Sequence, residues 1–256
     1  MTNQPLILVV NDDGFEAKGL EAMVEAAKNF GKVVVVVPDG PRSGMGHAIT
    51  MNVPLRINLY KKEFDIGYYR TNGTPVDCVK LAQRVLLKGE KIDLVLSGIN
   101  HGSNSSCSLI YSGTMAAAIE ASFEDIKAVG ISLLDYAPNA DFTTAIHYAK
   151  IIIDKVLHHE MPPHVCLNVN VPKVKIDEVQ GIKIVRQTKG YWHEDLEEHT
   201  DSFGRKYYWL SGHLVDQDQG EDTCEWALKN HYVSVQPVQT DMTAHHFINT
   251  LKFIEK

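Results

Sequence analysis

The stretch ILVVNDDGFEAKGLEAM, residues 7–23, places a short apolar run directly before three polar residues and a glycine. The apolar run from Leu6 to Val10 is typical of a strand that is buried on both faces. After Gly14, apolar residues recur at helical spacing as far as Ala27, and Val33 to Val37 form a second apolar run. This order predicts a βαβ unit, with parallel strands and a right-handed crossover.

The same alternation continues along the chain. Thr74 and Pro75 have the pattern of a helix start. The alternation predicts a doubly wound α/β fold with a mostly parallel sheet, and ligands are expected at the carboxyl ends of its strands. The segments expected after Thr74 are a strand in KIDLVLSGIN (residues 91–100), a helix in YSGTMAAAIEA (111–121), a strand in AVGISLL (128–134), a helix from Asp141 to about Leu157 and a strand in HVCLNVNV (164–171).

The pattern changes near Gly181, where aromatic residues and short β-prone runs replace the alternation. Examples are RKYYWLSG, residues 205–212, and NHYVSVQPV, residues 230–238. We therefore expect an α/β catalytic core over residues 1–180 and a β-rich C-terminal extension over residues 181–256, with a hairpin that serves as an oligomerisation arm. The two parts are expected to form one compact unit.

Composition limits the classes of function. The formal net charge of −7 argues against nucleic acid as the main partner, because binding a phosphate backbone needs a basic face. No apolar run has the length of a membrane span. The four cysteines show no CxxC spacing, and the first residues lack the basic segment of a signal peptide. We expect a cytoplasmic protein with reduced thiols and no membrane partner.

Polar clusters follow three of the predicted strands. Asp12 and Asp13 come after the first, Ser43 lies in the loop after the second, and Asn100 ends a later one. Two adjacent carboxylates repel each other unless a cation lies beside them. Carboxylate, hydroxyl and carboxamide oxygens suit Mg²⁺ or Mn²⁺, whereas a structural zinc site would favour Cys and His.

A fourth cluster lies at a predicted helix start. Ser112, Gly113 and Thr114 precede an alanine-rich helix. Unpaired N–H groups and the helix dipole at this end favour an anion, and Gly113 permits its close approach. An anion site next to a divalent metal on oxygen ligands indicates phosphate chemistry.

Several blocks together resemble the stationary-phase survival protein SurE family, in the same order and at similar spacing. The resemblance spans most of the chain, and the combination of blocks is highly specific. The blocks are VNDDG (residues 10–14), SGMGHAIT (43–50), NGTPVDCVKLA (72–82), DLVLSGINHGSN (93–104), YSGTMAAAIEA (111–121) and HYVSVQPVQTDMT (231–243).

The resemblance implies a metal-dependent nucleotidase that acts on nucleoside 5′-monophosphates, with 3′-monophosphates and short polyphosphate as further substrates. It also implies a Rossmann-like core and a C-terminal extension that is exchanged between subunits of a homodimer or homotetramer. One divalent ion per subunit, Mg²⁺ or Mn²⁺, would be held by Asp12, Asp13, Ser43 and Asn100. The residues expected to contact phosphate or substrate are Asn11, Gly44, Asn104, Ser112, Gly113 and Thr114.

The chain departs from the family pattern after Asn104. Many members continue with glycine and acidic residues, whereas this chain has SSCSLI, residues 105–110. The departure affects the expected lip of the substrate site and removes none of the expected metal ligands.

Catalytic roles follow as hypotheses. A water molecule is expected to attack phosphorus directly, with one of the two aspartates as its base; Asp13 is favoured, but the sequence leaves the choice between Asp12 and Asp13 open. The alternative, an aspartyl-phosphate, usually comes with a DxD pattern, whereas the acidic pair after the first strand is Asp12-Asp13 followed by Gly14. His47 either protonates the leaving oxygen or makes a structural hydrogen bond. The competing functions are a nucleotide-binding regulatory protein without turnover and an oligomeric scaffold.

Overall fold

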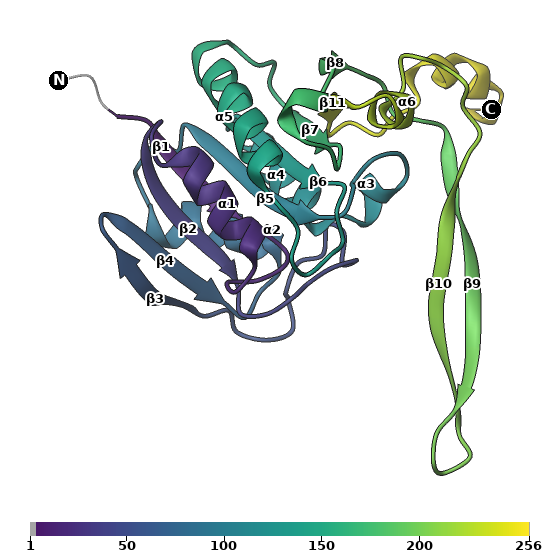
Figure 1. Cartoon of the computed structure of the whole chain (residues 1–256), viewed down its shortest axis with the longest axis horizontal. Coiled ribbons are helices and arrows are strands. Elements are labelled where there is room, and N and C mark those ends of the chain that lie inside the picture. Colours follow the sequence, from purple (N-terminus) through teal and green to yellow (C-terminus); the bar gives the residue numbers. More distant parts are fainter. Residues whose placement is uncertain (1–3, 256) are drawn as a thin grey trace.

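A computed structural model describes residues 4–255 and contains a central sheet with helices on both faces (Figure 1). The nine strands of this sheet follow the order β3-β4-β2-β1-β5-β6-β7-β11-β8, and β9 and β10 form a separate antiparallel pair. The expected α/β fold with a mostly parallel sheet is confirmed. The strands are β1 (Leu6–Val10), β2 (Lys32–Pro38), β3 (Ile57–Glu63), β4 (Ile66–Thr71), β5 (Leu94–His101), β6 (Ala128–Leu133), β7 (Val165–Val171), β8 (Gly181–Ile184), β9 (Gly190–Thr200), β10 (Lys206–Asp216) and β11 (Tyr232–Gln239).

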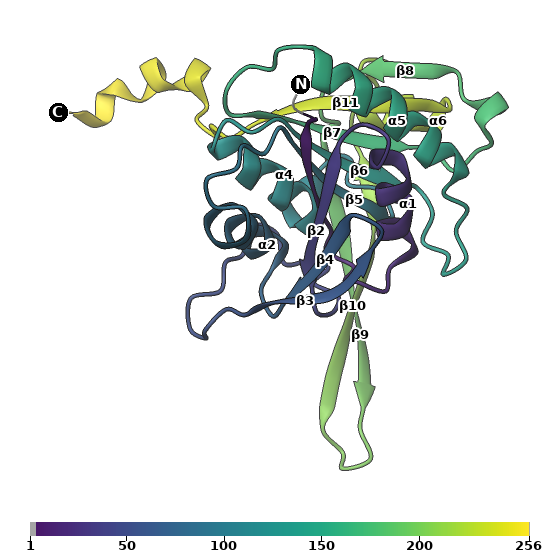
Figure 2. The same cartoon turned by 90° about the vertical axis from the view of Figure 1, so that its left-hand side faces the viewer.

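The helices cover the sheet in two layers. Figure 2 shows α1 and α5 on one face and α2 and α4 on the other. The helices are α1 (Lys18–Ala27), α2 (Pro75–Leu81), α3 (Ser108–Tyr111), α4 (Gly113–Phe123), α5 (Thr143–His158) and α6 (Cys224–Lys229), with a π-helical turn η1 (Ala82–Leu86) and 3₁₀ segments η2 (Ile176–Glu178) and η3 (His245–Glu255).

The central strand β1 contributes to a separate core on each face. Ile7 and Val9 pack in the cluster that contains the apolar side of α1 and α5, whereas Leu8 and Val10 pack in the cluster that contains α4. Alternate residues of a strand point to opposite faces, so a strand with helices on both sides must be apolar throughout. This is the physical reason for the apolar run that precedes the acidic pair.

The strand order reverses at β1. The chain first builds β2 on one side of β1 and later returns to place β5 on the other, and both pairs are parallel. A crevice forms at such a reversal, outside the carboxyl ends of the strands. Asp12 follows β1 and Asn100 lies near the end of β5, so the topology places both residues at this crevice.

Local sequence signals explain where the helices begin. Thr74 caps α2 in a reciprocal capping box with Asp77, and the Ser112 hydroxyl caps α4 by accepting from the Met115 N–H. The helix that was expected from Asp141 begins at Thr143, because the Asp141 carboxylate accepts from the Thr143 N–H and hydroxyl just before the first turn.

The segment after residue 180 divides between the sheet and the surface. β8 and β11 join the central sheet through an antiparallel β11–β7 pair and a parallel β11–β8 pair. The expected hairpin is formed by β9 and β10, which extend away from the rest of the molecule, and η3 projects in a different direction (Figures 1 and 2). The central sheet therefore draws strands from both sides of the expected boundary at residue 180.

Two further observations bear on the expected protein class. Cys78, Cys166 and Cys224 are buried free thiols, and Cys107 is a half-buried one. Within residues 4–255, no helix combines the length and the apolar character needed to cross a bilayer.

Candidate functional site

The turn after β1 is held by Asn11. Its side-chain Nδ2 donates to the Gly14 carbonyl at 2.7 Å, and the Gly14 N–H donates to Asn11 Oδ1 at 3.2 Å. Gly14 has a φ of +89°, a backbone conformation that residues with a Cβ rarely adopt. Asn11, expected to contact substrate, is buried with both ends of its amide bonded to this turn.

Asp12 is a buried carboxylate next to the start of α4. Its Oδ1 accepts a hydrogen bond of 2.6 Å from the Thr114 hydroxyl, and its side chain lies so close to Gly113 that a Cβ there would be 2.8 Å from the Asp12 Cβ. Burial raises the pKa of Asp12 from 3.8 to about 6, against the opposing effect of the Thr114 bond, and the charge of Asp13 adds to the rise. Gly113 and Thr114 thus shape the site by contacting Asp12.

Asp13 carries an unpaired oxygen. Its Oδ2 is buried and has no hydrogen-bond partner among the described residues. Burial raises the pKa of Asp13, and the nearby His101 acts in the opposite direction. A buried carboxylate oxygen without a partner is costly, and a cation is the partner that would offset the cost.

The Asn100 side chain lies near the end of β5, and the NH₂ group of its amide is used in hydrogen bonds to the backbone. Its Nδ2 donates to the carbonyls of Gly102, at 2.8 Å, and His101, at 3.2 Å. This arrangement leaves Oδ1 as the free end of the side chain. Gly98, two residues earlier, has a φ of +119°, and a Cβ there would lie 2.2 Å from the Ile131 carbonyl oxygen of the neighbouring strand.

Two backbone hydrogen bonds hold the loop that carries Ser43 against the turn after β1 and against the end of α3. The Arg42 N–H donates to the Asp12 carbonyl at 2.7 Å, and the Gly46 N–H donates to the Tyr111 carbonyl at 3.0 Å. Ser43 is exposed between these two attachment points. The structure thereby brings the loop after β2 next to the acidic turn after β1.

A cleft of about 560 Å³ opens at the crevice, and we call it the β1–β5 cleft. Its lining contains two acidic residues, Asp12 and Glu194, and no Lys or Arg of the described chain. Six of the residues expected at the site line it together: Asp12, Ser43, Gly44, Asn100, Asn104 and Ser112. Four other expected residues do not line the cleft but lie within two positions of residues that do: Asn11, Asp13, Gly113 and Thr114.

Asn104 is fixed by a buried polar network. Its Nδ2 donates to Ser132 Oγ at 2.9 Å, its N–H donates to Asn170 Oδ1 at 2.8 Å, and its carbonyl accepts from Asn168 Nδ2 at 2.9 Å. The two asparagines of β7 were not singled out from the sequence. The signal was their alternation with valine in a strand that is otherwise apolar, because a fully buried polar side chain needs a specific partner.

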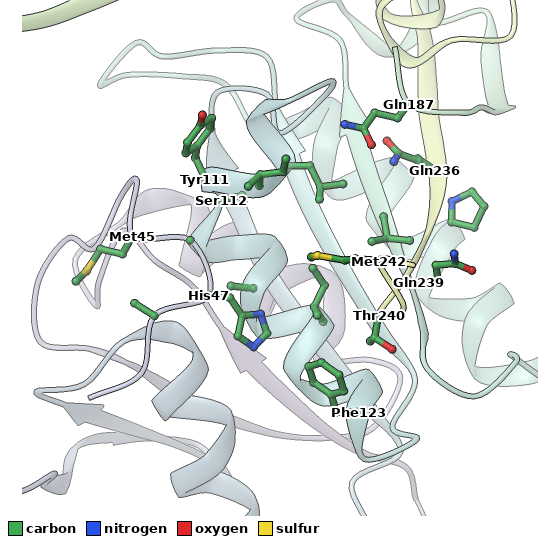
Figure 3. A pocket seen from close by; sticks show the side chains of 18 of the residues that line it. Met45, His47, Tyr111, Ser112, Phe123, Gln187, Gln236, Gln239, Thr240 and Met242 are labelled. Carbon is green, nitrogen blue, oxygen red and sulfur yellow. The ribbon is translucent and has the colours of Figure 1, made fainter. Parts of the chain in front are cut away.

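His47 lies outside the β1–β5 cleft. It lines a second cavity of about 1100 Å³, which we call the His47 cavity and which shares Gly44, Tyr111 and Ser112 with the cleft (Figure 3). His47 Nε2 lies 2.9 Å from the Glu120 carboxylate, which also pairs with Lys80. Burial acts to raise the pKa of Glu120, but His47 and Lys80 outweigh this effect and lower it. The catalytic role of His47 stays a prediction.

The donor set at the cleft is built from oxygen. Within residues 4–255, no three His, Cys, Asp or Glu residues gather in a way that would hold a metal ion. The expected ligand set contains only two carboxylates. Its other two members, Ser43 and Asn100, are oxygen donors suited to a hard cation. Asp12, Ser43 and Asn100 line the cleft, and Asp13 adjoins Asp12 with its orphaned Oδ2.

The chain resembles known proteins along most of its length. The family model described as Survival protein SurE matches residues 7–194. The chain is 53% identical to a 5′-nucleotidase SurE of Flavobacterium psychrophilum, over 97% of each chain, and 52% identical to that of Flavobacterium johnsoniae, over 97% of this chain and 96% of the relative.

A solved structure extends the likeness to the whole fold. The crystal structure of the SurE protein from Aquifex aeolicus superposes with a TM-score of 0.85 at 38% identity, covering 98% of this chain and 100% of that one. The likeness therefore includes the segment beyond residue 194 that the family model leaves out. On sequence and fold together, the chain belongs to the SurE family of survival proteins.

Proposed function

We propose that the protein is a 5′-nucleotidase that hydrolyses nucleoside 5′-monophosphates with a divalent metal ion in the β1–β5 cleft. The observation that carries the proposal is that Asp12, Ser43 and Asn100, from three separate segments, line one cleft beside the first turn of α4. The names of the curated relatives supply the reaction class, since they are 5′-nucleotidases.

The charge of the cleft supports the need for a cation. A phosphomonoester carries negative charge, and the described lining offers it acidic side chains and no Lys or Arg. Without a cation, Asp12 and Asp13 would repel the substrate. We assign one Mg²⁺ or Mn²⁺ per subunit to Asp12, Asp13, Ser43 and Asn100. The unpaired Asp13 Oδ2 and the free Oδ1 of Asn100 fit this assignment.

Each side chain at the site then has a separate role in the reaction. A divalent ion held by these oxygens would lower the pKa of a water molecule and offset phosphoryl charge. Asp13, the more exposed of the two carboxylates, accepts the proton of the attacking water, while Thr114 holds Asp12 through its hydroxyl. The N-terminus of α4, which begins after Ser112, lies beside the cleft, so its dipole offsets the developing negative charge, and Asn104 orients the phosphoryl group.

The substrate range is a second part of the proposal. Nucleoside 3′-monophosphates and short polyphosphate present the same terminal phosphoryl group to the same oxygens. We expect them to be hydrolysed as well, with lower kcat/KM.

Phosphate release decides between turnover and binding alone. AMP and GMP are incubated with Mg²⁺ or Mn²⁺, and the reaction is repeated with EDTA. Release that stops with EDTA supports the proposed function. Binding of nucleotide without release under any of these conditions would instead favour a regulatory nucleotide-binding protein.

Oligomerisation belongs to the proposal too. η3 exposes Phe247, Ile248, Leu251, Phe253 and Ile254, and the β9–β10 hairpin exposes aromatic residues along its length. Large exposed apolar surfaces mark association sites. We assign the C-terminal extension to contacts within a homodimer or homotetramer, in which this extension is exchanged between subunits.

Free thiols and the acidic composition are consistent with a protein of the cytoplasm.

A further inference from the structure

The β1–β5 cleft has a second set of lining residues, which differ in chemistry from the polar ones. Tyr136, Trp192 and Leu210 contribute two aromatic rings and an aliphatic side chain. They come from the loop between β6 and α5 and from the two strands of the hairpin, whereas the proposed metal ligands follow β1, β2 and β5. One cleft thus combines oxygen donors with aromatic surface.

Trp192 is anchored and still accessible. Its indole N–H donates to Ser108 Oγ at 3.2 Å, which fixes the ring against α3, and 37% of the residue remains exposed. Alternate residues of a strand share a face, so Glu194 points to the same side of β9 as Trp192, and both line the cleft. The Glu194 carboxylate would repel phosphate and therefore directs the phosphoryl group toward the metal ligands.

Tyr136 is held over the backbone next to Asn100. Its ring packs on Gly102, where an added Cβ would lie 2.1 Å from Tyr136 Cε1. Gly102 has a φ of +92°, and its carbonyl accepts the Asn100 amide at 2.8 Å. Tyr136 is 73% exposed, so most of the residue is free to contact a ligand.

We propose that Tyr136 and Trp192 form the nucleobase subsite of the cleft, an inference that rests on the proposed function. A ligand held by its phosphoryl group at the metal end presents its other end to these rings. Aromatic faces bind any base by stacking, and they read few of its hydrogen-bonding edges. The subsite therefore selects nucleotides over smaller phosphate esters, with little preference between adenine and guanine.

The test compares two substrates that differ only in the base. AMP and ribose 5-phosphate share the sugar and the phosphate ester, and only AMP carries a base. The variants are Trp192→Ala, Tyr136→Ala and the aromatic replacement Trp192→Phe. Tyr191→Ala is the matched control, because Tyr191 is the neighbouring exposed aromatic residue of β9, points to the opposite face of the strand and does not line the cleft.

Trp192→Ala and Tyr136→Ala should each lower kcat/KM for AMP by about 5- to 150-fold, mainly through KM, because stacking contributes equally to ground and transition states. The kcat/KM for ribose 5-phosphate should stay within about twofold, since that ester makes no base contact. Trp192→Phe should recover most of the loss, and Tyr191→Ala should behave as wild type. Equal losses with both esters, or no loss with AMP, would overturn the subsite.

A separate outcome distinguishes failure of the proposed function. If the wild-type protein with Mg²⁺ or Mn²⁺ releases phosphate from neither ester, the hydrolytic assignment is wrong. Calorimetric titration of adenosine, which has no phosphate, then tests the subsite directly. Binding that Trp192→Ala weakens and Tyr191→Ala leaves unchanged supports it, and binding that Trp192→Ala leaves unchanged refutes it.

Discussion

Replacing the buried carboxylate Asp12 with asparagine should stabilise the metal-free protein while it abolishes activity. The pKa of Asp12 rises from 3.8 to about 6 on folding, mainly because the carboxylate is buried. Above pH 6, ionised Asp12 therefore costs the folded state about two pKa units, or ~3 kcal/mol. Asparagine has nearly the same shape and retains an oxygen that can accept from Thr114, but it carries no charge.

The dependence on pH has a defined sign. The folded state binds the Asp12 proton more tightly than the unfolded state does, so between about pH 4 and pH 6 the stability of the wild type falls as pH rises. The Asp12→Asn variant lacks this loss. Its advantage in the free energy of unfolding should approach ~3 kcal/mol at about pH 8 and should shrink toward zero near pH 4.

Urea denaturation with EDTA, at one fixed protein concentration and at both pH values, measures this difference. Asp65→Asn is the control, because Asp65 lies exposed in the turn between β3 and β4 and should give no gain at either pH. An Asp12→Asn variant no more stable than wild type near pH 8, or equally stabilised at both pH values, would refute the reasoning. The same variant should release no phosphate from AMP with Mg²⁺ or Mn²⁺.

Three further changes probe the site and its surroundings. Adding Mg²⁺ or Mn²⁺ at about 100 times the dissociation constant should stabilise the wild type by ~2.7 kcal/mol in thermal unfolding, and Asp12→Asn should lose most of that gain. Thr114→Val removes the hydroxyl that donates to Asp12 and should lower kcat by about 10- to 100-fold, since hydrogen bonds to charged groups contribute ~1.5–3 kcal/mol; a kcat equal to wild type would show that this bond does not support catalysis. Deleting residues 245–255 should give a smaller species in sedimentation velocity if η3 holds subunits together, and an unchanged sedimentation coefficient would exclude η3 from the interface.

Much of the fold could be predicted because its signals are local. The apolar run of β1, the capping residues of α2 and α4 and the valine run of β2 each determine a short element through burial or capping alone. Parallel strands share one carboxyl edge, so the same reasoning places Asp12 and Asn100 close together. The structure gathers both residues in one cleft.

Other features depend on contacts between distant segments. β8 and β11 pair with the central sheet, although their sequences resemble those of the exposed hairpin. His47 comes only three positions after Gly44, which lines the cleft. The His47 ring nevertheless pairs with Glu120 of α4 and lines the His47 cavity. Trp192 reaches the cleft from a strand far along the chain.

The α/β core and the oxygen-rich turns at the ends of its strands can be predicted from the amino-acid order alone, because strand burial, helix capping and parallel pairing follow from residues close together in the chain. The cavity that each loop side chain enters, and the surfaces that complete the cleft, become visible only in the folded molecule. Those choices depend on packing between residues far apart in sequence, where a small change in the path of a loop moves a side chain from one pocket to the next.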